Sequence, residues 1–181
     1  AVNVDGTSRL VAACRRAGVR RFVHVSTIAV KYPDKRWYPY ARSKEAAEAI
    51  VRESDLDYLI VRPTIVLGVG SPASASLRHL ARPWHTIVLG HGRTRIQPID
   101  VDDLARILAA LLADGRFARE TLELGGPEVV AVGEFLRLLS ARGGRRPPAL
   151  HVPLTPVVAV LGRLERLLLP VLPVTAGQLS V

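Results

Sequence analysis

The amino-acid sequence predicts an α/β protein in which helices cover both faces of a doubly wound parallel sheet. Three observations predict this class. The first seventy residues alternate between helical and strand-like patterns, the connections between them are short, and the strand-like segments are mostly apolar runs. Two strands do not complete such a sheet, so we expect the remaining strands to come from residues upstream of Ala1. On this interpretation the 181 residues are a piece of a longer protein, truncated at its N-terminus.

Local signals predict the first four elements. Leu10, Val11 and Cys14 recur at helical spacing, and Gly18 ends that helix. The strands are short runs of apolar and β-branched residues, and the second of them stops at Pro63. The predicted elements are a helix over residues 5–17, a strand over 20–26, a helix over 40–53 and a strand over 57–62.

Beyond residue 70 the pattern changes to that of a smaller α+β lobe. We expect the sheet domain to comprise residues 1–70 and the lobe residues 71–181, with residues 95–125 returning to the sheet. Residues 71–76 are small and predict a flexible segment. The remaining predicted elements are a helix over 77–83, strands over 86–89 and 94–99, a helix over 100–113, a strand over 121–124, a helix over 132–141, a strand over 149–152 and a helix over 155–169.

The net charge of +9 is strongly basic, but its distribution does not indicate binding of nucleic acid. The basic residues are spread in pairs along the chain, and only 5% of the residues are aromatic, so no base-stacking surface is evident. No apolar run of 18 residues is free of charge, so a membrane span is not expected. We expect a cytoplasmic protein and leave open its association with the anionic surface of the inner membrane.

Tyr40 and Lys44 are the first candidates for chemistry. They are four residues apart, so in a helix they lie on one face, one turn apart. An ammonium beside a phenol favours the phenolate, and we expect Lys44 to lower the pKa of Tyr40 toward the range of a working acid or base. The alternative is an ordinary surface helix on which a tyrosine and a lysine coincide.

Two hydroxyl residues, Ser26 and Thr27, follow the first predicted strand and precede the Tyr40 helix. Open α/β sheets hold their ligands at the carboxyl ends of the strands, which is where these hydroxyls would lie. There a hydroxyl can hydrogen-bond a substrate carbonyl or alcohol and share its proton with the phenol. The alternative is that both residues only cap a turn.

Two other kinds of site are not expected in this chain. Asp100, Asp102 and Asp103 open a predicted helix, where carboxylates stabilise the positive helix end, and no histidine joins them at metal-ligand spacing. No segment matches Gly-x-x-Gly-x-x-Gly between a strand and a helix, the loop that holds a dinucleotide pyrophosphate. We therefore expect no metal site, and negligible affinity of the isolated chain for a dinucleotide.

Several segments together carry a family pattern. Four occur in order: Asn-Val-Asp-Gly-Thr at 3–7, the strand and its hydroxyls at 18–27, Tyr-Ala-Arg-Ser-Lys at 40–44 and Val-Arg-Pro-Thr-Ile-Val-Leu-Gly at 61–68. They resemble the NAD-dependent epimerase/dehydratase family, which are extended short-chain dehydrogenases/reductases. Segments 92–105, 122–128 and 172–179 are similar to its atypical branch, which includes the NAD(P)H-binding accessory subunit of respiratory complex I.

The resemblance covers nearly the whole chain and implies roles for the candidate residues. It implies the C-terminal part of a Rossmann-type doubly wound parallel sheet and a small α+β substrate lobe. In that family pattern Thr27 occupies the catalytic Ser/Thr position, with Ser26 as the second choice. Tyr40 would be the acid/base, and Lys44 would also hold the nicotinamide ribose.

The resemblance further implies a cofactor, NAD or NADP, and a small-molecule substrate. The substrate would be a sugar nucleotide, an alcohol or ketone, or a quinone-like molecule. The residues expected to bind the cofactor are Ser26, Tyr40, Lys44, Arg62, Pro63, Thr64 and Ile65. The last four would lie along the nicotinamide and substrate cleft, largely through their backbone.

Three functions are consistent with these observations. The leading one is an NAD(P)-dependent oxidoreductase or epimerase-like protein, in which Tyr40 moves a proton while hydride passes between substrate and cofactor. The second is a non-catalytic NAD(P)H-binding accessory protein, because the 12 residues between Thr27 and Tyr40 form a loop of the length typical of the atypical branch. The third is a binder at a membrane surface or of quinones, which the basic charge and the apolar segment 157–169 permit.

Overall fold

The computed structural model of the chain describes residues 2–36, 38–82, 84–114, 116–141 and 147–153. These residues form two compact units. The first, the sheet unit, comprises the described residues up to Thr64 together with Ile99–Gly125. The second, the lobe unit, comprises Ile65–Pro98 and the described residues from Gly126 onward. Each unit has a buried apolar core of its own.

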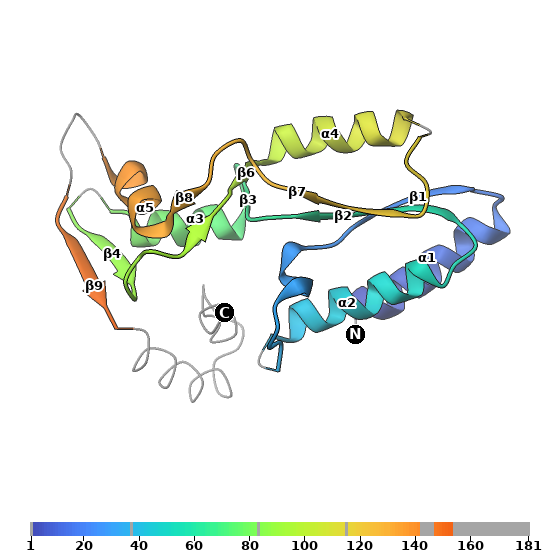
Figure 1. The fold of residues 1–181 in the computed structure, drawn as a ribbon, viewed down its shortest axis with the longest axis horizontal. Coiled ribbons are helices and arrows are strands. Elements are labelled where there is room, and N and C mark those ends of the chain that lie inside the picture. Colours follow the sequence, from blue (N-terminus) through green and yellow to red (C-terminus); the bar gives the residue numbers. More distant parts are fainter. Residues whose placement is uncertain (1, 37, 83, 115, 142–146, 154–181) are drawn as a thin grey trace. The chain divides into compact units, whose positions relative to one another are not determined.

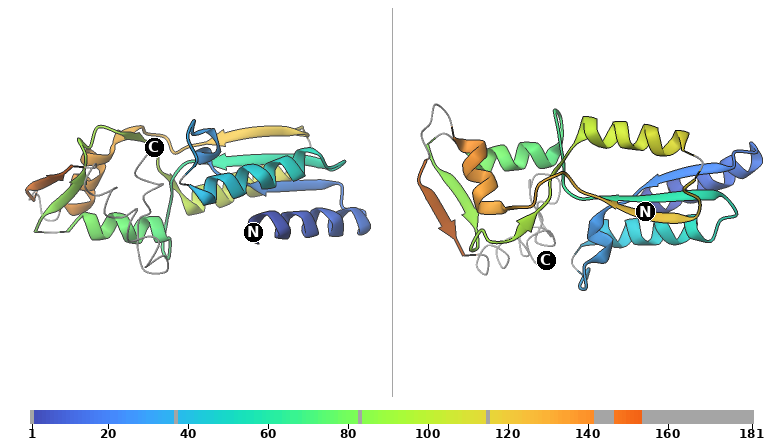
Figure 2. Two further views of the ribbon diagram at one scale, coloured as in Figure 1. Left: turned by 90° about the horizontal axis from the view of Figure 1, so that it is seen from below. Right: turned by 45° about the horizontal axis from the view of Figure 1, so that its top comes forward.

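The sheet unit is built on three parallel strands. In spatial order they are β1 (Arg21–Val25), β2 (Asp57–Pro63) and β7 (Glu120–Leu124). Leu59, in the central strand, lies between Val23 and Glu120 in the register. The three strands run side by side in every view (Figures 1 and 2). The predicted parallel α/β sheet is therefore confirmed, and β1 and β2 agree with the predicted strands to within one residue at each end.

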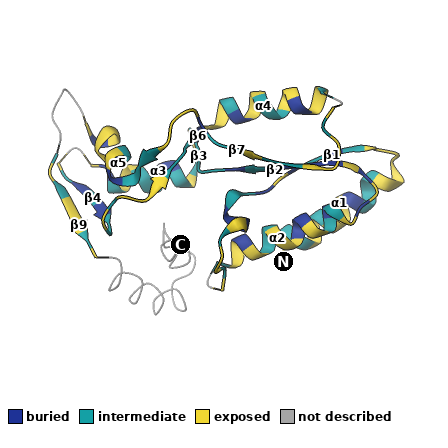
Figure 3. Cartoon of the chain, in the orientation of Figure 1, coloured by how far each residue is buried: buried dark blue, intermediate teal, exposed yellow. Residues whose placement is uncertain are grey.

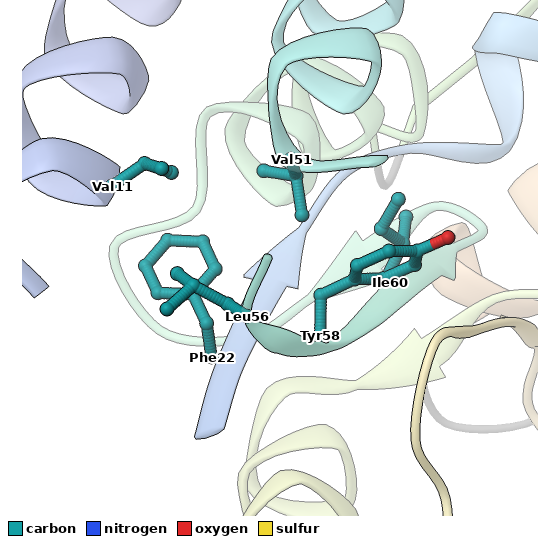
Figure 4. Close-up of a cluster of buried hydrophobic side chains, with 6 residues drawn as sticks. All are labelled: Val11, Phe22, Val51, Leu56, Tyr58 and Ile60. Atoms are coloured by element: carbon teal, nitrogen blue, oxygen red, sulfur yellow. The ribbon is translucent and has the colours of Figure 1, made fainter. Parts of the chain in front are cut away.

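Helices cover both faces of this sheet (Figure 1). They are α1 (Val2–Arg16), α2 (Pro39–Arg52) and α4 (Val101–Ala113). β2 is buried or intermediate over most of its length (Figure 3), and its side chains alternate between two cores. Tyr58 and Ile60 pack in one core with side chains of α1 and α2 (Figure 4), whereas Leu59 and Val61 pack in the other with Leu111 of α4.

Polar contacts hold both ends of α4. At its start, Asp100 accepts a hydrogen bond from the backbone N–H of Asp102 at 2.8 Å. At its end, Arg21 of β1 donates to the carbonyl oxygen of Leu111 at 2.7 Å and also to that of Asp114. The acidic helix start therefore acts as a cap, as the sequence predicts, and an arginine of the sheet donates to two carbonyl oxygens at the other end.

The lobe unit is a small α+β assembly. Its elements are β3 (Val66–Leu67), α3 (Pro72–Leu80), β4 (Thr86–Leu89), β5 (Arg95–Ile96), β8 (Val130–Ala131), α5 (Val132–Ser140) and β9 (Ala149–Val152). β4 and β9 pair in parallel, and β5 and β8 pair antiparallel. Ala81, Val88 and Leu136 form its buried core.

Two local predictions for residues beyond 70 are wrong. Residues 71–76, predicted to be flexible, open helix α3, because Ser71 Oγ accepts the Ser74 N–H at 3.4 Å and Pro72 suits the first helical turn. The predicted strand over 94–99 is two short strands, β5 and β6 (Ile99–Asp100), because Pro98 lacks the N–H that a continuous ladder needs. The helix predicted over 155–169 lies outside the described residues.

Gly92 of the lobe unit offers a test of its packing. Its φ is +64°, and a Cβ there would lie 2.5 Å from Val88 Cγ1 and 3.1 Å from Gly133 Cα. We expect Gly92→Ala to lower the free energy of unfolding by about 3 kcal/mol, through backbone strain and overpacking together. The control is Gly18→Ala: Gly18 has φ +68° but nothing within 4 Å of the added Cβ, so about 1 kcal/mol is expected. Equal losses in urea unfolding would contradict this close packing.

Candidate functional site

The candidate site lies in the sheet unit, at the carboxyl ends of β1 and β2. The backbone N–H of Ser26 donates to β2 at 2.7 Å, and that of Thr64 donates to β7 at 2.8 Å. Ser26 and Thr27 therefore leave the sheet at the same edge as Pro63 and Thr64, because the strands are parallel. Ile65, also predicted to border the cleft, belongs to the lobe unit.

Helix α2 carries Tyr40 and Lys44 on one face, one turn apart at its N-terminal end. Lys44 Nζ donates to the carbonyl oxygen of Val25 at 3.0 Å, which holds the ammonium at the carboxyl end of β1. Tyr40 is 45% exposed. The structure thus brings Lys44 to the strand end that Thr27 follows, and it leaves part of the Tyr40 ring open to an incoming molecule.

Burial sets the pKa of both groups in this arrangement. It raises the pKa of Tyr40, because the phenolate would lose water, and it lowers the pKa of Lys44, because the ammonium would lose water. The expectation that Lys44 lowers the pKa of Tyr40 is therefore wrong for the chain as it stands. Tyr40 is a neutral phenol near pH 7, which makes it a proton donor.

Tyr40 belongs to a row of three tyrosines that the sequence analysis missed. The rings of Tyr32 and Tyr38 are stacked, with centroids 6.4 Å apart, and the rings of Tyr38 and Tyr40 are tilted, with centroids 5.9 Å apart. The neighbouring Tyr38 ring covers part of the Tyr40 side chain, which is consistent with the partial burial of Tyr40. The signal was present in the sequence as three tyrosines within nine residues.

The two hydroxyl candidates differ in their surroundings. Thr27 is partly exposed, and its Oγ1 accepts the backbone N–H of Ala29 at 3.3 Å at the start of a short 3-10 helix, η1 (Ile28–Lys31). Ser26 is only 3% exposed, and its Oγ has no hydrogen-bond partner among the described residues. Thr27 caps a turn, which was the alternative to a catalytic role, yet its O–H can still donate to a ligand.

Glu48 is the residue of this region that the sequence analysis missed. It lies four residues after Lys44 on α2, and its side chain is 1% exposed. Arg62 of β2 donates from Nε to Oε1 at 2.9 Å and from Nη2 to Oε2 at 2.7 Å, and Arg52 donates to Oε2 at 2.6 Å.

These arginines control the charge of Glu48. Burial alone would raise the pKa of this carboxyl, but hydrogen bonds from Arg62 and Arg52 outweigh it and lower the pKa to about 2. The Ser26 hydroxyl lies near enough to assist, although its geometry is not that of a hydrogen bond. Glu48 is therefore ionised near pH 7 despite its burial.

The side chain of Arg62 is engaged within the protein. Its guanidinium is bound by Glu48 and lies 3.6 Å from Glu123 of β7, which leaves the predicted backbone contact with the cofactor as it was. Glu123 in turn binds Lys31 of η1 at 3.0 Å. A chain of alternating charges thus joins α2, β2, β7 and η1 beneath the candidate site.

His24, on β1, adds a neutral polar group to this buried region. It is 9% exposed, and its Nε2 has no hydrogen-bond partner among the described residues. Burial lowers its pKa and Lys44 lowers it further, while Glu48 opposes them. His24 is therefore a buried residue of the sheet, and its lowered pKa keeps the imidazole neutral near pH 7.

Within the part of the chain that the structure describes, no cluster of three metal-ligating side chains occurs. Nor is any helix in the described ranges long and apolar enough to cross a membrane. The lobe unit has an open hollow of about 650 Å³, with His91, Arg93, Glu134, Arg137 and His151 among its lining residues.

The fold and the site define a class of protein: a parallel α/β sheet with a Tyr-x-x-x-Lys helix at the carboxyl ends of its strands. Comparison with known proteins agrees. Residues 2–115 match the family described as NAD(P)H-binding, and the chain belongs to that family. The cofactor class of the family, NAD or NADP, is the one that the resemblance implies.

Individual relatives place the chain more narrowly. It is 28% identical over 166 residues to the mitochondrial NADH-ubiquinone oxidoreductase 40 kDa subunit of Neurospora crassa, covering 90% of this chain and 43% of the relative. It is 37% identical over 109 residues to the ceramide reductase of Caulobacter vibrioides, and the match covers 60% of this chain and 33% of that relative. Its fold matches the structure of MoeE5 in complex with UDP-glucose and NAD, with a TM-score of 0.68 and 24% identity. The match covers 83% of this chain and 57% of MoeE5.

These matches confirm the predicted resemblance to the NAD-dependent epimerase/dehydratase family and to its atypical branch, which includes the accessory subunit of complex I. The chain spans less than half the length of the two curated relatives that it matches. What those whole proteins do is therefore not established for this chain by the similarity.

Proposed function

We propose that this chain supplies the proton-transfer site of an NAD(P)-dependent oxidoreductase or epimerase-like protein of the short-chain dehydrogenase/reductase superfamily. The observation that supports it most is the position of Lys44. Its Nζ lies 3.0 Å from the carbonyl oxygen of Val25, at the strand end that Thr27 follows and one helical turn from Tyr40. The bound nicotinamide would supply or accept hydride at a carbinol or carbonyl carbon.

The donors at this strand end fit the nicotinamide-ribose part of such a cofactor. Lys44 has three N–H donors and the hydrogen bond to Val25 uses one, which leaves donors for ribose hydroxyls. Pro63 and Thr64, at the end of β2, are proposed to border the nicotinamide through their backbone. The buried Ser26 side chain and the ion-paired Arg62 side chain are better suited to supporting roles.

In this proposal Tyr40 and Thr27 act on the substrate oxygen. Because its pKa is raised, Tyr40 carries its proton at Oη near pH 7 and can give it to an alkoxide. Thr27 orients the same oxygen by donating its hydroxyl proton. In the reverse direction Tyr40 must first lose its proton, a step that its raised pKa makes less favourable.

A second function, a non-catalytic NAD(P)H-binding protein of the respiratory accessory type, is favoured by a different observation. The loop between Thr27 and Tyr40 has 12 residues, the length typical of the atypical branch. The similarity to the Neurospora 40 kDa subunit supports the same interpretation. In that case the cofactor would be structural or regulatory, and the Tyr40–Lys44 pair would only mark the ribose position.

The substrate and the place in the cell are proposed more broadly. We infer a small-molecule substrate, either a sugar nucleotide, an alcohol or ketone, or a quinone-like molecule. The fold of MoeE5, solved with UDP-glucose, supports the first kind, and the name of the Caulobacter ceramide reductase supports a carbonyl substrate. The charge of +9 supports peripheral association with an anionic membrane surface.

Cofactor binding tests the proposal. We expect the full-length protein to bind NAD(H) or NADP(H) in isothermal titration calorimetry. We expect residues 1–181 alone to bind it more weakly than about 1 mM, because they contain no glycine loop for the pyrophosphate. Micromolar binding by residues 1–181 would contradict the second expectation. Absence of binding by the full-length protein to both cofactors would overturn the proposed function.

A further inference from the structure

The proposed proton transfer leaves one buried charged group of the site region without a task. Glu48 lies on the same face of α2 as Tyr40 and Lys44, since the three residues are spaced by four. Its carboxylate is enclosed, with a side chain 1% exposed, so it does not meet a substrate. Its contacts therefore act on the protein itself.

Glu48 and Lys44 attach α2 to two neighbouring strands. Lys44 Nζ binds the carbonyl oxygen of Val25 at the end of β1. Glu48 binds Arg62 near the end of β2 through two parallel hydrogen bonds of 2.9 and 2.7 Å. A bidentate carboxylate–guanidinium pair has one preferred plane, so it restrains direction as well as distance.

Two attachments on one helix face fix more than either does alone. The apolar face of α2, which includes Val51, already packs against the sheet. Polar contacts at successive turns to two adjacent strands add directional restraints on the rotation of the helix and on its position along the sheet. Tyr40 lies one turn before Lys44 on this face, so the direction of its phenol follows from the same two contacts. Arg52, one turn after Glu48 on the same helix, donates from Nη2 to Glu48 Oε2 at 2.6 Å and so also holds the carboxylate.

Stability alone is a poor explanation for this pair. Removing two charges from water costs free energy, and apolar residues of similar size often stabilise a protein as well as a buried ion pair does. An apolar pair, however, has no directional bonds with which to set the rotation of a helix. The contacts of Arg62 with Glu123, and of Glu123 with Lys31, extend the restraint to β7 and to the turn after Thr27.

We propose that Glu48 is a positioning residue, which through Arg62 sets the rotation of α2 and thereby aligns Tyr40 and Lys44 with the end of β1. The alignment of α2 does not depend on the proposed function. Only its purpose, which is proton transfer by Tyr40, rests on that function. The same alignment also gives the side chain of Arg62 a role as the partner of Glu48.

The test uses the full-length protein and three variants. Glu48→Gln keeps the size of the side chain and removes its charge. Glu48→Met combined with Arg62→Met replaces the pair by apolar chains and keeps the protein folded if the single variant is unstable. The control is Glu45→Gln on the same helix, where Glu45 is 51% exposed and pairs with Lys35 at 2.8 Å.

The first measurement is independent of turnover. NMR of ¹³C-labelled tyrosine, assigned with Tyr40→Phe, follows the titration of the Tyr40 phenol. Burial raises this pKa in the native arrangement, so a displaced α2 should bring it back toward 10. We expect that change in Glu48→Gln and in the double methionine variant, and none in Glu45→Gln. If the folded double variant titrates like the wild type, the pair only fills space and the proposal is overturned.

The second measurement is turnover. We expect Glu48→Gln to lower kcat by about tenfold or more, because misplacement of Tyr40 acts on the proton-transfer step. The KM for cofactor should rise by a smaller factor, because Lys44 moves with the same helix but is only one of the proposed cofactor contacts. An unchanged kcat overturns the positioning role. If the wild type shows no turnover while its Tyr40 titration still responds to Glu48→Gln, the catalytic function fails and the positioning of α2 is supported.

Discussion

Replacing Tyr40 by phenylalanine should lower the turnover of the full-length protein by roughly 10²–10⁴-fold, the range that loss of a positioned acid/base produces. The phenylalanine ring keeps the aromatic contact with Tyr38 and removes only the hydroxyl that carries the proton. Cofactor affinity should stay within about twofold, because Lys44 and the ends of the strands are untouched. The measurement is steady-state kinetics beside calorimetric titration of NAD(H) and NADP(H).

A matched control exists in the same tyrosine row. Tyr32→Phe removes a hydroxyl from the ring stacked on Tyr38 and should leave turnover unchanged. If Tyr40→Phe turns over as fast as the wild type, Tyr40 is not the acid/base. If the wild type binds cofactor tightly but turns over none of a broad panel of sugar nucleotides, alcohols and quinones, the accessory-type function is supported instead.

Replacing Glu48 by alanine should produce the largest loss of stability of any single change discussed above, about 3–5 kcal/mol. The variant leaves the Arg62 guanidinium without its bidentate partner in a place where its side chain is only 17% exposed. It also opens a cavity between α2 and β2. Urea unfolding measures the loss, and Glu45→Ala, at the exposed pair with Lys35, should cost less than about 1 kcal/mol.

The contribution of Glu48 should also depend on pH. Its pKa is about 2 in the folded chain, compared with an ordinary value of 4.5. A lowered carboxyl pKa stabilises the folded state above pH 4.5, and this stabilisation is lost as the pH falls toward 2. The difference corresponds to about 3 kcal/mol. The gap in unfolding free energy between wild type and Glu48→Ala should therefore narrow between pH 4.5 and 2, and a constant gap would contradict the assigned ionisation.

The sequence predicted those parts of the fold for which local signals and burial agree. β2 is an apolar run that ends at a proline, and α2 has apolar residues at helical spacing after Pro39, so both were found nearly to the residue. The start of α3 was missed although Ser71 and Pro72 are a readable helix start, because the small residues that follow suggested a loop.

For the site, the sequence located the residues but not their electrostatics. The spacing of Tyr40 and Lys44 was enough to place them on one helix face. That Glu48 is buried could not be seen, because a glutamate on a helix is ordinarily a solvated charge and its partner Arg62 lies on another element. The raised pKa of Tyr40 was equally hidden, since it depends on how much water the folded site excludes.

The central position of β2 has a consequence for motion. Its backbone is hydrogen-bonded to β1 on one side and β7 on the other, so we expect its amides to be among the slowest of the sheet unit to exchange with solvent. Thr27, by contrast, caps a 3-10 helix of four residues, which we expect to open locally at lower cost. Hydrogen exchange should therefore be slow at the β2 wall of the candidate site and faster at the Thr27 wall.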